Sequence, residues 1–112
     1  MTRAEIYTML NAIGIPCVYH HFSEGSGQQP PFICFYYPND NDFKADDTRY
    51  VRVDALTIEL YTDNKDFTLE ETVENALLGA GLVFTKTESY IDTEKMFMVV
   101  YETEVLINGQ QN

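Results

Sequence analysis

The sequence predicts an α+β domain in which two helices pack on one face of an antiparallel sheet, in the order α-β-β-β-α-β-β. Two segments, 2–13 and 68–80, place apolar residues at helical spacing, and each begins with a threonine followed three residues later by a glutamate. Segment 50–62 is rich in strand-forming residues. Segments 83–90 and 97–105 alternate in polarity on either side of a short turn, which is typical of a hairpin. A helix layer on a sheet buries the apolar side of both.

The first helix is expected over about residues 3–12. Thr2 and Glu5 fit a capping box, in which each side chain accepts a hydrogen bond from the other residue's backbone N–H. Gly14 can adopt the left-handed conformation that commonly ends a helix, and Pro16 prevents the helix from continuing. The helix therefore has a start and an end signal of its own.

Three strands are expected between the helices. Residues 17–22 form a short strand, 23–31 a loop by composition, and 32–37 an aromatic strand that is apolar on both faces. Residues 38–47 form a long acidic loop, and 50–62 the third strand. Loops of this length in a small domain are uncommon unless they bind something or are disordered.

The third strand changes its apolar phase midway. Val51, Val53 and Ala55 share one parity, and Leu56, Ile58 and Leu60 share the other. A regular strand cannot put both sets on one face. Either a bulge near residues 54–56 reconciles them, or the first half projects beyond the core and packs its opposite face on something else.

The second helix is expected to begin at a second capping box, formed by Thr68 and Glu71. Gly79 and Gly81 mark its end. Residues 108–112 are expected to form a frayed tail, and residues 1–112 a single domain.

The composition restricts the class of function. Eighteen acidic and seven basic residues give a formal charge of -11 and a pI near 4.3. This balance opposes specific nucleic-acid binding and attachment to anionic membranes. No apolar run approaches a membrane span or a signal peptide, so we expect a cytosolic protein. Cys17 and Cys34 are expected to be reduced, buried thiols whose sulfurs could lie close if their strands are neighbours.

No motif for chemistry stands out. His20 and His21 would point to opposite faces of a strand, which makes a shared metal ion difficult. A calcium loop counted from Asp40 places Ala45 and Val51 where glycine and glutamate are needed, so only a weak, irregular cation site stays open. Two carboxylates could still meet in space as acid and base, but no pair is indicated. We therefore expect no enzyme activity, no cofactor and no metal.

Partner contacts are the remaining expectation. Phe43 in the acidic loop is either an anchor for a neighbour or a residue folded back on its own sheet. Arg49 and Arg52 beside that loop suit a charge pair between subunits or within the chain. The residues expected at subunit or partner contacts are Phe32, Phe35, Tyr37, Asp40, Asp42, Phe43, Asp46, Asp47, Arg49 and Arg52.

The chain resembles the tail terminator proteins (also called tail completion or head–tail joining proteins) of long-tailed phages, in particular those in prophages of Gram-positive bacteria. The likeness covers roughly residues 7–107. It is carried by the strings GIPCVYHHF (14–22), PFI (31–33), FKAD (43–46), IELYTDNKD (58–66), and ESYI (88–91) with EKM (94–96). None of these strings is catalytic, so the specificity of the match lies in their number and order.

The resemblance implies a hexameric ring at the top of the tail tube. Such a ring ends tube polymerisation, docks to the head connector, and lets DNA pass. The implied partners are other copies of the chain (with a monomer possible in isolation), the major tail tube protein and the head–tail connector protein. The implied location is the host cytoplasm during assembly and then the neck or tail of the virion. Six copies would carry 6 × (-11) = -66 formal charges, which would keep DNA from adhering.

Two other classes of function stay open. An acidic domain with aspartates on its loops could mimic DNA and inhibit a host DNA-binding enzyme, although the acids here divide among a loop, a helix start and strand edges. A small hydrolase is the third possibility. A pull-down from host lysate separates the first two, because a mimic should capture a basic enzyme and a terminator should capture tail tube protein.

Overall fold

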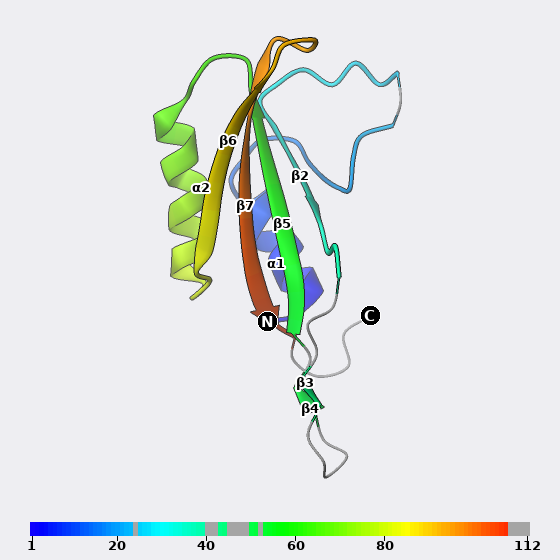
Figure 1. The fold of residues 1–112 in the computed structure, drawn as a ribbon, viewed down its shortest axis with the longest axis vertical. Coiled ribbons are helices and arrows are strands. Elements are labelled where there is room, and N and C mark those ends of the chain that lie inside the picture. Colours follow the sequence, from blue (N-terminus) through cyan, green and yellow to red (C-terminus); the bar gives the residue numbers. More distant parts are fainter. Residues whose placement is uncertain (24, 40–42, 45–49, 52, 108–112) are drawn as a thin grey trace.

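The computed structural model describes residues 1–23, 25–39, 43–44, 50–51 and 53–107, and its elements follow the predicted order (Figure 1). One addition is a two-stranded ribbon, whose first strand lies inside the predicted acidic loop. The predicted tail, 108–112, lies outside the described residues. The elements are α1 (Arg3–Asn11), β1 (Cys17–Tyr19), β2 (Phe32–Tyr36), β3 (Phe43–Lys44), β4 (Tyr50–Val51), β5 (Val53–Thr62), α2 (Phe67–Gly79), β6 (Phe84–Ile91) and β7 (Met96–Leu106).

The main sheet has five strands in the order β1-β2-β5-β7-β6. Every neighbouring pair is antiparallel except β1 and β2, which are parallel. The predicted α+β fold with an antiparallel sheet is confirmed, and the β1–β2 pair at one edge is parallel instead. A parallel pair needs a connection long enough to return the chain to the end where it started, and residues 20–31 provide it.

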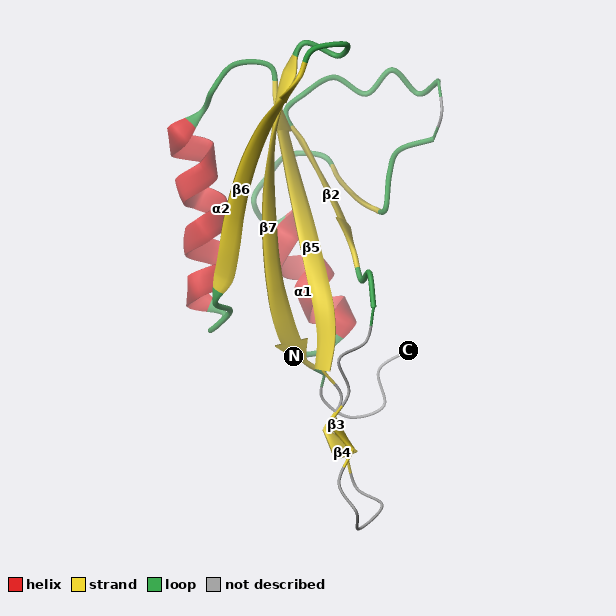
Figure 2. Cartoon of the chain, viewed as in Figure 1, coloured by secondary structure: helices red, strands yellow, loops and turns green. Residues whose placement is uncertain are grey.

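One face of the sheet carries the core. Leu56, Ile58 and Leu60 of β5 and Tyr101 of β7 are buried on this face. Both helices contribute buried residues to the same cluster, and Figure 2 shows them alongside the sheet. These helical residues are Ile6 and Leu10 from α1, and Val73 and Leu77 from α2. None of the described helices has the length and apolar character needed to cross a bilayer.

The phase change in segment 50–62 has a structural explanation. β5 pairs with β7 in unbroken register from Val53 opposite Leu106 to Thr62 opposite Phe97, so there is no bulge at residues 54–56. Val51 instead belongs to β4, which pairs with β3 beyond the end of the main sheet (Figure 1). The projecting alternative was therefore correct in this respect.

An ion pair explains why a polar residue, Asp54, points toward the helices at the start of β5. Asp54 faces the helices and is fully buried. The Nη2 and Nε atoms of Arg3, in α1, lie 2.5 and 3.0 Å from Asp54 Oδ2. The inward apolar series therefore starts at Leu56, while the apolar residues Val53 and Ala55 face the other way.

The two helix starts differ in how well they were predicted. The capping box of α1 is confirmed, because the Glu5 N–H donates to Thr2 Oγ1 at 3.0 Å and the Thr2 N–H donates to Glu5 Oε1 at 2.8 Å. The capping box predicted for α2 was wrong. The cap is Asp66, whose Oδ1 accepts from the Leu69 N–H at 3.0 Å, and aspartate is as good a cap as threonine.

Glu70, near the start of α2, is buried in an ion network. Its carboxylate is 2% exposed and lies 2.6 Å from Lys65 Nζ and 2.9 Å from Lys86 Nζ. Lys86 also contacts Glu74 at 2.7 Å, and the Tyr101 hydroxyl donates to Glu74 at 2.8 Å. Burial alone would raise the pKa of Glu70, but the hydrogen bonds and charges of the two lysines outweigh it and lower the pKa.

Candidate functional site

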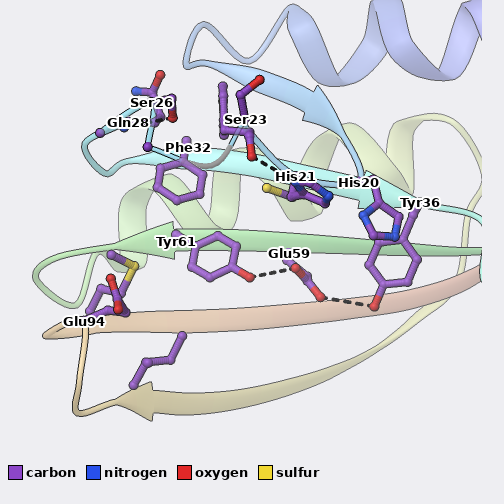
Figure 3. A pocket seen from close by; sticks show the side chains of 16 residues that line it. His20, His21, Ser23, Ser26, Gln28, Phe32, Tyr36, Glu59, Tyr61 and Glu94 are labelled. Atoms are coloured by element: carbon purple, nitrogen blue, oxygen red, sulfur yellow. Dashed lines mark hydrogen bonds between the residues drawn. The ribbon is translucent and has the colours of Figure 1, made fainter.

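The face of the sheet away from the helix core, here called the open face, carries a cavity lined by described residues. It bears the odd-numbered residues of β5 together with Cys34 and Tyr36 of β2. Residues from the 20–31 connection and from the β6–β7 turn line the same hollow, which has a volume of about 730 Å³. Figure 3 shows the loop residues Ser26 and Gln28 near Phe32 at one end of this hollow.

Glu59 lies at the floor of the cavity between two tyrosines (Figure 3). The Tyr61 hydroxyl donates to Oε1 at 2.7 Å, and the Tyr36 hydroxyl donates to Oε2 at 3.1 Å. Burial and the bond to the Glu59 carboxylate raise the pKa of Tyr61. Burial and the charge of Glu59 likewise raise the pKa of Tyr36. Both hydroxyls therefore keep their protons and hold the carboxylate in place.

Aromatic rings form the walls around this carboxylate. Phe32 stacks on Tyr61 with ring centroids 4.7 Å apart, and Phe22 meets Phe32 edge-on at 5.3 Å. On the other side, the His20 ring lies 5.6 Å from the Tyr36 ring. The cavity therefore presents one carboxylate surrounded by aromatic rings.

The two histidines are not on opposite faces, as a continuous strand would require. β1 ends at Tyr19, and His20 has a φ of 72°, which turns the chain and brings the His20 and His21 rings to 4.8 Å from each other. The His20 N–H donates to the Phe35 carbonyl at 2.7 Å. Both histidines line the cavity. Within the described ranges, no three His, Cys, Asp or Glu side chains gather as a metal site would need.

The two cysteines lie on neighbouring strands but point to opposite faces. Cys17 packs against the core, and Cys34 lines the cavity. Burial raises the pKa of each thiol to about 11, with a smaller contribution at Cys17 from Cys34 and at Cys34 from Glu59. Both are therefore unreactive neutral thiols at neutral pH.

We predict slow reaction of both thiols with an aromatic disulfide reagent. Two pKa units above the ordinary thiol value leave roughly 100-fold less thiolate at pH 7.5. The folded chain should therefore react about 100-fold more slowly than the chain unfolded in urea, followed by absorbance of the released thiolate. Equal rates in the two states would contradict the burial of both cysteines.

The structure separates the residues predicted for partner contacts. Phe35 is 4% exposed and packs in the core, because alternate residues of β2 face the helices. Tyr37 is half-buried, with the Arg3 guanidinium 5.3 Å from its ring, and Phe32 lies on the open face instead. The backbone of Phe43 pairs with Val51 in the ribbon. The remaining predicted residues, Asp40, Asp42, Asp46, Asp47, Arg49 and Arg52, lie outside the described residues.

Sequence reasoning missed the set formed by Tyr36, Glu59 and Tyr61. A weak signal existed, since Glu59 and Tyr61 share a parity opposite to that of the core residues Ile58 and Leu60. This parity indicated that β5 has a second face, but it did not indicate that β2 lies beside β5 and contributes residues to that face.

Four of the exposed apolar side chains lie near the two opposite edges of the sheet, and Phe67, Tyr90 and Leu106 are exposed elsewhere in the chain. Tyr19 in the edge strand β1 and Tyr7 in α1 both contact Phe35, at centroid distances of 5.4 and 6.0 Å. Near the other edge, Leu78 of α2 is 57% exposed and Val83, just before β6, is 83% exposed. Large exposed apolar residues of this kind often mark protein contacts when they gather in patches.

Comparison with known proteins adds one informative likeness. No family model and no curated protein sequence matches this chain. Among solved structures, the fold is similar to that of a chain in the virion of a native gene transfer agent particle. The TM-score is 0.67 and the identity is 16%. The match covers 93% of this chain and 92% of the other, so the two share a fold over nearly their whole length.

Proposed function

We propose that this chain is a structural subunit of a phage-like virion. The observation that carries the proposal is the near-complete fold match, in both directions, to a chain of a gene transfer agent virion. The sequence resemblance to tail terminators supports the same class of particle by a separate route. Within the particle, the proposed role is to cap the tail tube, end its polymerisation and join the tail to the head connector as a ring subunit.

The placement of exposed apolar residues supports assembly into a closed ring. A ring is built by heterologous contacts, in which one surface of each copy meets a different surface of the next. The patch of Tyr7 and Tyr19 lies at the β1 edge, and the patch of Leu78 and Val83 at the β6 edge. β6 is also an edge strand whose outer side has no neighbour among the described strands. Two such surfaces on opposite sides of one subunit suit this geometry.

The test is electron microscopy of particles assembled without this chain. We expect tails of uncontrolled length that fail to join heads, and recovery of normal particles when the chain is supplied in trans. A pull-down should capture tail tube protein. Tails of normal length that are joined to heads would overturn the proposal. Capture of a basic DNA-binding enzyme would favour the DNA-mimic alternative.

A further inference from the structure

The Glu59 carboxylate is held in a position to accept two further hydrogen bonds. Each of its oxygens accepts from one tyrosine, Tyr61 at Oε1 and Tyr36 at Oε2. A carboxylate oxygen has two lone pairs, so each keeps a second acceptor position. Two parallel N–H donors on one planar group would match this arrangement, as a guanidinium does when it binds a carboxylate through both oxygens.

The walls of the cavity favour a flat cation over a neutral group. Phe32, Tyr36 and Tyr61 line the hollow around the carboxylate. Aromatic faces attract cations, and a guanidinium also stacks on them because it is planar and weakly hydrated. The volume of about 730 Å³ accommodates a long side chain together with its neighbours in sequence.

The charged residues that line the cavity are negative, like Glu59 at its floor. Glu59 and Glu94 line it, and no lysine or arginine does so among the described residues. The nearby cations are engaged elsewhere: Arg3 binds Asp54, and Lys65 and Lys86 bind Glu70. Lys95 lines an adjoining hollow, which shares Glu94 with this cavity and also contains Asp63.

We propose that this cavity binds an arginine side chain presented by a partner protein, with the guanidinium forked onto Glu59 and bordered by the rings of Phe32, Tyr36 and Tyr61. The partner is a basic segment of a different protein, because the cavity presents Glu59 and Glu94 and so complements a basic surface, which a chain of formal charge -11 offers poorly. The proposal does not rest on the assembly role, since it follows from the cavity alone.

The test compares two small probes of similar size and shape, one with a cationic guanidinium and one with a neutral ureido group. Acetyl-arginine amide and its neutral counterpart, acetyl-citrulline amide, are titrated into the ¹⁵N-labelled chain and followed by NMR. We expect the arginine probe to shift the signals of Tyr36, Glu59 and Tyr61 and to bind about tenfold tighter than citrulline, since a charge-assisted pair is worth roughly that factor. Equal binding of the two probes would overturn the proposal.

Variants of the carboxylate complete the design. Glu59→Gln should bind the arginine and citrulline probes about equally. Glu71→Gln removes the same charge from the exposed surface of α2 and should keep the preference for arginine. Should Glu59→Gln fail to fold, Glu59→Asp keeps the charge but withdraws the carboxylate by one methylene, and the same loss is expected. Unchanged arginine binding in a folded Glu59 variant would refute the assignment. Sedimentation showing self-association that depends on Glu59 would refute the choice of a foreign partner.

Discussion

Replacing Leu77 with alanine is expected to lower the free energy of unfolding by about 2–5 kcal/mol. Leu77 is fully buried in α2, where it belongs to the cluster between the helices and the sheet. The substitution removes the apolar contacts and leaves a cavity that the neighbouring side chains fill only in part. Thermal melting should show a fall of about 4–8 °C for each kcal/mol lost in a domain of this size.

The next residue along the chain provides a matched control. Leu78 undergoes the same chemical change in Leu78→Ala, but its side chain is 57% exposed. Its effect on the free energy of unfolding should stay within about 0.5 kcal/mol. If the patch of Leu78 and Val83 is a subunit contact, Leu78→Ala should still weaken ring assembly, measured by sedimentation or by rescue of tail length. Similar destabilisation by both substitutions would contradict the burial pattern of α2.

Replacing Glu70 with glutamine is expected to lower the free energy of unfolding at pH 7 by about 1.5–3 kcal/mol, the usual worth of hydrogen bonds to a charged group. The Glu70 carboxylate is buried and lies within 3 Å of the ammonium groups of both Lys65 and Lys86. A neutral amide in the same place loses the charge-assisted part of both contacts.

The same carboxylate should make stability depend on pH in a defined direction. The pKa of Glu70 is lowered from its ordinary value near 4.5, so its contribution is complete above that value and is lost as the pH falls through the lowered pKa. The pKa values of Lys65 and Lys86 are raised from 10.5, so their contribution is complete below that value and is lost as the pH rises through the raised pKa. The ion network is therefore fully formed between about pH 4.5 and 10.5.

Urea unfolding at pH 7 and at pH 3 measures this dependence. The difference in the free energy of unfolding between the native chain and Glu70→Gln should shrink at the acid pH, because pH 3 lies below the ordinary pKa near 4.5 and the unfolded chain takes up a proton there. Glu71→Gln, at the exposed neighbouring position, should change the free energy of unfolding by less than about 0.5 kcal/mol at either pH. If the difference in the free energy of unfolding between the native chain and Glu70→Gln stays constant with pH, the shape of Glu70 and not its charge explains its role.

Elements with strong local signals were predictable. The capping box of Thr2 and Glu5 placed α1, and alternating polarity with a short turn placed the hairpin of β6 and β7. The start of α2 was misplaced because Asp66 and Thr68 are both good caps, and the local sequence does not choose between them.

The helices, the main strands and the acidic character of this protein were therefore readable from the sequence, because periodicity, caps and net charge depend on neighbouring residues. The parallel pairing of β1 with β2 and the cavity around Glu59 were decided only in the folded chain. Tyr36 and Glu59 are 23 residues apart, and they meet because β2 lies beside β5 with both side chains on the open face. Whether two distant strands become neighbours depends on how the whole core is buried, and local patterns carry no record of it.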